Sequence, residues 1–143
     1  MGSEARATDV MEAPQQNTKI ARLIVQRIND EREVLHALFV QPLFTTAETQ
    51  LEPFHFIEST NADIFKAMVG CDSIMLPRTV RRVAHVLLRN RCYNSRAIKH
   101  VLYTDPRIAL CHFGWCCDEI RRHAKYQEKY RAAVEMIDEI ENS

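Results

Sequence analysis

NTKIARLIVQRINDEREVLHALFV, residues 17–40, decides the fold of this chain. Apolar residues recur in it at the three- and four-residue spacing of a helix, and all fall on one side of a helical wheel. They are Ile20, Leu23, Ile24, Ile28, Val34, Leu35, Leu38 and Phe39. Asn17 or Thr18 suits a helix N-cap, and Pro42 stops the helix just beyond its end. The stretch therefore predicts one long amphipathic helix that ends near Val40.

Shorter helices are predicted along the rest of the chain. Capping residues followed by apolar residues at helical spacing mark five further stretches, 60–70, 77–90, 95–103, 106–117 and 126–141. The last two have no Gly or Pro between them and can join into one helix. Three glycines and five prolines in 143 residues are few, which favours long helices over a turn-rich β protein. We predict an all-α, single-domain bundle of five or six helices over residues 17–143, with residues 1–16 as a disordered tail.

Two details of this bundle are predicted as well. In the connection 41–58, Thr45 and Glu48 have the spacing of a capping box, and Phe54 and Phe56 are expected to plug the core. Residues 108–117 (IALCHFGWCC) are apolar on nearly every side of a helix. A helix with this pattern is normally buried. We expect this segment to be the central core element, with Phe113 and Trp115 as its largest side chains.

Composition excludes several classes of protein. The chain has 19 Lys+Arg and 19 Asp+Glu, and no apolar run approaches the roughly 18–20 residues needed to span a bilayer. The first residues lack the apolar region of a secretory signal. Five cysteines, an odd number, then point to reduced thiols in the cytoplasm or nucleus. We expect an intracellular protein with no membrane contact.

No catalytic or cofactor motif is present. The sequence has no phosphate loop, dinucleotide fingerprint, HExxH or GxSxG motif, so we expect a non-enzymatic protein without a cofactor. His112, Cys116 and His123 share one face of a helix, near Cys111. No CxxC pair accompanies them, whereas structural zinc sites draw ligands from separate elements at recognisable spacings. We interpret these cysteines as small buried thiols and predict no metal site.

A basic block is the one feature that points to a partner. No acidic residue occurs from Ser73 to Thr104. On a helix over 77–90, four of its cationic or imidazole side chains fall within about 60° of Arg78, opposite the apolar ones. We predict that the partner-binding residues of the block are Arg78, Arg81, Arg82, His85, Arg89, Arg96 and Lys99.

Three interpretations of this block stay open. It is a solvated face without a partner, a docking face for a protein, or a set of phosphate contacts to nucleic acid. The last is supported by the helix-turn-helix proportions of residues 77–103, although the turn lacks Gly and the chain is not basic overall. A membrane surface is excluded because the apolar face of this helix is needed for the core and lacks Trp and Phe.

We favour an intracellular adaptor or complex subunit that docks a protein partner through this basic face and an apolar C-terminal stripe. The stripe consists of Tyr126, Tyr130, Ala133, Ile137 and Ile140. The partner can be another protein or, because so much apolar surface is predicted, a second copy of this chain. The alternative function is nucleic-acid binding through residues 77–103.

Overall fold

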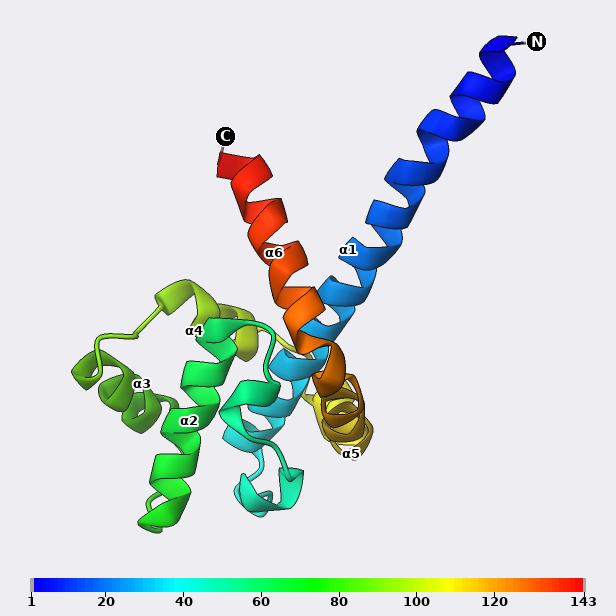
Figure 1. Ribbon diagram of the computed structural model, residues 1–143. Coiled ribbons are helices and arrows are strands. Elements are labelled where there is room, and N and C mark those ends of the chain that lie inside the picture. Colours follow the sequence, from blue (N-terminus) through cyan, green and yellow to red (C-terminus); the bar gives the residue numbers. More distant parts are fainter. Residues whose placement is uncertain (1, 143) are drawn as a thin grey trace.

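The computed structural model confirms the all-α class (Figure 1). It describes residues 2–142, and side chains from Thr18 onward except at positions 125, 127, 128 and 130. Over residues 2–142 there are six α-helices and no strand. The helices are α1 (Gly2–Val40), α2 (Ser59–Ser73), α3 (Val80–Arg89), α4 (Ser95–Leu102), α5 (Pro106–His123) and α6 (Gln127–Asn142). Three 3₁₀ turns complete the chain: η1 (Ala47–Thr49), η2 (Pro53–His55) and η3 (Ala124–Tyr126).

The long helix α1 organises the fold. It ends at Val40 as predicted, but it continues upstream of the predicted start at Asn17 or Thr18 without a break. Figure 1 shows this first part of α1 projecting away from the other helices. A helix end with no packing partner is held only by its own hydrogen bonds and is marginal in water. Residues 2–16 therefore lie outside the bundle, as the sequence predicts for a tail.

The core lies where α5 crosses the second half of α1, which is the most extensive helix pair of the fold. From α1, buried Val34, Leu35 and Leu38 face buried side chains of α2, α4 and α5. Phe113 of α5 stacks on Phe44, with ring centroids 4.3 Å apart and planes within 12°. Burying such side chains contributes about 1.5–3 kcal/mol each relative to exposure.

Only one side of α5 is buried, so the prediction for residues 108–117 is partly wrong. Ala109, Phe113, Cys116 and Cys117 face the core, whereas Trp115 is 51% exposed. Leu110 is also exposed on the outer side. A helix packed mainly against one neighbour buries one stripe, whatever the chemistry of its other side. The expected position of α5 beside α1 is correct; its burial on every side is not.

The connection 41–58 folds back along α1. The predicted capping box is present: Glu48 N donates to Thr45 Oγ1 at 3.1 Å, and Thr45 N donates to Glu48 Oε1 at 2.6 Å. Phe56 is fully buried against Phe65, with ring centroids 5.0 Å apart. Phe54, in contrast, is exposed, so only one of the two predicted aromatic plugs reaches the core.

A side chain of α1 caps helix α2 from outside. Glu31, which is buried, accepts hydrogen bonds from Ile57 N at 2.6 Å and Glu58 N at 3.3 Å. A carboxylate at a helix N-terminus satisfies the free N–H groups and favours the helix dipole. Helix α2 runs from Ser59 to Ser73, so it begins one residue before the predicted stretch 60–70 and ends three residues after it.

The caps of the next helices are local. Thr79 accepts from Arg82 N, Asn94 from Ala97 N and Asp105 from Arg107 N, each at the first turn of a helix. Asn94 and Asp105 stand immediately before the predicted stretches 95–103 and 106–117. The basic helix, however, begins at Val80 rather than in the turn at Pro77. The 3₁₀ turn η3 joins α5 directly to α6, which matches the predicted last helix.

Candidate functional site

A groove between the end of α2 and helix α3 has a volume of about 820 Å³. Its walls are apolar: Ile74, Leu76 and Leu88 are all exposed to solvent there. Helix α3 packs mainly against α2, through the buried side chains of Val83 and Leu87. The groove therefore lies beside the contact that these two side chains make with α2.

The edge of this groove is cationic. Arg82, His85 and Arg89 follow one another at helical spacing on one face of α3, and Arg81 lines the groove beside them. All four are exposed. Among the described side chains, no carboxylate lies within ion-pair distance of these three arginines. The structure thus brings together four of the seven residues that the sequence predicts.

Arg78 does not belong to this face, and the prediction for it is wrong. Its side chain is 6% exposed and forms an ion pair with Asp72. Its guanidinium also donates to the carbonyl oxygens of Leu38, at 3.2 Å, and of Phe44. A cation at the carbonyl end of α1 satisfies groups that the helix leaves unpaired and suits the helix dipole. Arg78 lies before α3, so its wheel position on a helix from Pro77 does not apply.

Arg96 and Lys99, the remaining predicted residues, lie on α4 and outside the groove. Both are exposed, and Arg96 borders a separate small hollow beside Glu58 and Arg32. Helix α4 packs against α1 and α2, while α3 packs mainly against α2. The two helices do not form the packed pair of a helix-turn-helix, so the geometry gives the nucleic-acid alternative no support.

The C-terminal stripe begins at Tyr126 in η3 and continues along α6, which Figure 1 shows apart from α3. Ala133 and Ile137 are half-buried, since α6 contacts α1 near their crossing. Tyr126 and Ile140 are exposed. The side chain of Tyr130 lies outside the described residues. None of the stripe lines the groove, so the two predicted partner surfaces are separate.

The side chains considered for a metal on α5 do not meet as a set. His123 lies against Glu119, with Nε2 3.2 Å from a carboxylate oxygen, and Cys111 is exposed. Cys116 instead faces α1, where its sulfur contacts Asp30 and Glu33. Those two acids were not singled out from the sequence. They belong to a polar strip of the α1–α5 contact that also contains buried Arg27, which bridges Asp30 at 3.0 Å and Glu119 at 2.9 Å.

No helix in the described part of the chain is long and apolar enough to cross a membrane. No protein family model matches the chain, and no curated protein or solved structure does so either.

Proposed function

We propose that this chain is a non-enzymatic interaction module that binds an acidic, amphipathic segment of a partner protein in the α2–α3 groove. The observation that carries the proposal is an apolar groove with a cationic edge and no acid among its lining residues. An occupant needs apolar side chains for Ile74, Leu76 and Leu88, and carboxylates for Arg82 and Arg89. A helix with one apolar and one acidic face meets both needs.

The energy of such binding is expected to come mainly from the apolar contacts. Exposed charges at an edge steer association and select a partner, but contribute little affinity each. The arginines therefore provide selectivity for acidic partners, and the groove walls provide the affinity. The stripe on α6 stays a prediction as a second contact.

The five free cysteines of the chain support a reducing compartment, the cytoplasm or nucleus, for this proposed module.

The test is binding of a fluorescein-labelled peptide designed as an acidic amphipathic helix, followed by fluorescence anisotropy. A scrambled peptide of the same composition, without an apolar face, is the control ligand. We expect binding of the designed peptide only. The double variant R82E/R89E and the single variant L88S are each expected to weaken it at least tenfold. The matched control R96E/K99E, which reverses two exposed cations of α4, is expected to leave it unchanged.

Two results would contradict the proposal. The scrambled peptide could bind as tightly as the designed one, or R96E/K99E could weaken binding as much as R82E/R89E does. Either result would show an unspecific charge effect. Duplex DNA tests the rival function, for which Arg82, Arg89, Arg96 and Lys99 are the cations expected to contact phosphates. With about four phosphate contacts, log K would fall with log salt at a slope near −3.6. We expect a shallow slope for the peptide and no DNA binding near physiological salt.

A further inference from the structure

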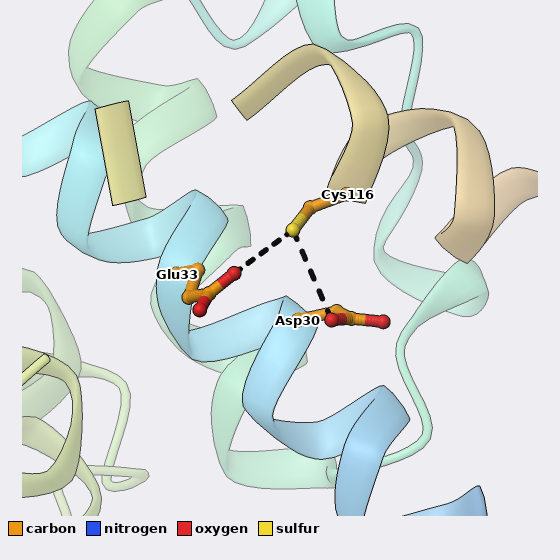
Figure 2. A group of neighbouring side chains, drawn as sticks. All are labelled: Asp30, Glu33 and Cys116. Atoms are coloured by element: carbon orange, nitrogen blue, oxygen red, sulfur yellow. Dashed lines mark hydrogen bonds between the residues drawn. The ribbon is translucent and has the colours of Figure 1, made fainter. Parts of the chain in front are cut away.

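Side chains from α1 and α5 gather three metal-ligating groups in the interior of the fold. Figure 2 shows Asp30 and Glu33 of α1 pointing toward Cys116 of α5. The Cys116 sulfur lies 3.0 Å from Glu33 Oε2 and 3.8 Å from Asp30 Oδ1. One donor atom from each residue lies within 4.8 Å of the others. The two acids are three residues apart on one helix, so both face the same side.

His112 lies at the mouth of this cluster. It precedes Cys116 by four residues, one turn of α5, and its Nδ1 is 3.8 Å from Glu33 Oε2. Its side chain is 54% exposed, and the imidazole has to turn toward the sulfur to join the three groups that lie together. The cluster thus combines a thiol, an imidazole and two carboxylates, the donor types that bind Zn²⁺ in proteins.

Asp30 has few hydrogen bonds for a buried carboxylate. The residue is 5% exposed, and among the described residues its carboxylate accepts one hydrogen bond, the long one from the Cys116 thiol to Oδ1. Its Oδ2 is buried without a hydrogen bond and meets only the Arg27 guanidinium as an ion pair. Buried carboxylates normally accept several hydrogen bonds or bind a cation.

The charges facing the cluster leave it anionic. Arg27 is shared between Asp30 and Glu119, and Glu119 is also met by Arg122 and His123. His112 faces Glu33 from the solvent side. A divalent cation would stabilise the ionised carboxylates that now lie close together.

We propose that Asp30, Glu33, His112 and Cys116 form a binding site for Zn²⁺. In a tetrahedral zinc site with Zn–S near 2.3 Å and Zn–O near 2.1 Å, sulfur and oxygen ligands lie roughly 3.6 Å apart. The two sulfur–oxygen distances here, 3.0 and 3.8 Å, lie on either side of that value. On binding, the S–H bond of Cys116 breaks, an S–Zn bond forms and the proton leaves to solvent.

Such a site would join the two central helices, because its ligands are divided equally between α1 and α5. It is separate from the α2–α3 groove and does not depend on the function proposed for it. A ligand that binds only the folded state raises its stability by mass action. At a hundredfold excess of free Zn²⁺ over Kd, the melting temperature is expected to rise by about 8 °C.

The site is testable with Co²⁺, which replaces Zn²⁺ and gives a visible spectrum. The reduced, chelator-treated protein is titrated with Co²⁺. The absorption of a cobalt–thiolate bond is followed, together with fluorescence of Trp115, the one tryptophan of the chain. The Trp115 and His112 rings are 6.3 Å apart, so bound Co²⁺ quenches this emission. We expect one equivalent to bind and Zn²⁺ to displace it.

Variants separate this site from other thiols. C116S is expected to abolish the cobalt–thiolate absorption, and E33Q to weaken Co²⁺ binding at least tenfold. E33Q keeps the size of a partly exposed side chain, so it tests the site even if C116S fails to fold. The matched control is C111S, because Cys111 is exposed on the same helix and outside the cluster. The proposal is overturned if wild type shows no thiolate band, if E33Q binds like wild type, or if C111S removes the band.

Discussion

The guanidinium of Arg78 is ion-paired with the carboxylate of Asp72, and this pair joins the segment before α3 to the last turn of α2. Both partners have further contacts. Asp72 accepts from Thr46 N at 2.8 Å and from Thr46 Oγ1 at 2.7 Å, while Arg78 reaches the carbonyl of Leu38 in α1. The pair therefore ties the end of α1, the loop after it and the end of α2 together.

Replacing Arg78 is expected to destabilise the fold. Arg78→Ala leaves the Asp72 carboxylate and the carbonyl of Phe44 without their partner, which costs about 3 kcal/mol of unfolding free energy. The matched control Arg81→Ala removes an exposed arginine and is expected to change stability by less than about 0.5 kcal/mol. Urea unfolding followed by circular dichroism measures both. If both variants lost the same small amount of unfolding free energy, Arg78 would be a surface residue like Arg81.

Asp72 also predicts a loss of stability in acid. Partial burial raises the pKa of its carboxyl, but the hydrogen bonds from Thr46 and Arg78 outweigh this and hold the pKa below its ordinary value of 3.8. A carboxyl with a lowered pKa in the folded state stabilises the fold above its unfolded pKa and loses this contribution as the pH falls through the folded one. The Asp72→Asn variant is expected to have a lower free energy of unfolding than wild type at pH 7. This difference between the two proteins should become smaller below about pH 4. A difference that is the same at pH 7 and pH 3 would contradict this.

Two aromatic residues of α5 are expected to differ in how much stability the protein loses when each is changed to Ala. Phe113 is 8% exposed and stacks on Phe44. Phe113→Ala should lower the free energy of unfolding by about 3–5 kcal/mol. Trp115 is half-exposed, so Trp115→Ala should cost only about 1 kcal/mol. Thermal or urea unfolding measures both variants. A large loss for Trp115→Ala would restore the prediction that α5 is buried on every side.

Glycine is absent where the backbone requires it and present where it does not. Met75 follows α2 with φ 57°, in the left-handed region, and Leu76 N bonds back to Cys71 O at 2.9 Å. Met75→Gly removes the strain of its Cβ and should stabilise by about 1 kcal/mol. Gly114 lies within α5, and a Cβ there would meet nothing within 4 Å, so Gly114→Ala should also stabilise by about 1 kcal/mol.

Differential scanning calorimetry tests both changes at Met75 and Gly114. The control is Met75→Ala. This variant keeps a Cβ in the left-handed region and should not be more stable than wild type. A destabilised Gly114→Ala variant would mean that a neighbouring helix approaches α5 closely at this position.

Local features of the fold were predictable because their causes lie within a few residues. The capping box of Thr45 and Glu48 and the caps at Asn94 and Asp105 depend on side chains two or three positions from the groups they bind. The apolar side of residues 17–40 likewise follows from spacing alone. These local features were enough to predict the helices of the bundle.

Features made by distant parts of the chain were not predictable in this way. Arg78 is buried because the end of α1, some forty residues upstream, offers it carbonyl oxygens. The groove exists because Ile74 and Leu76 lie opposite α3, which no spacing reveals. One indication was present: Arg27 and Glu31 fall within the apolar side of α1, and charged residues at such positions require buried partners.

The two walls of the groove are expected to differ in local stability. Helix α3 has ten residues, and Val83 and Leu87 are the buried side chains that attach it to α2. A short helix with so few buried contacts opens locally at a much lower free energy than global unfolding. Backbone amides of α3 should thus exchange with deuterated water long before those of α5. An occupant of the groove would slow that exchange selectively, so the kinetics of α3 amides are a direct report on whether the groove is filled.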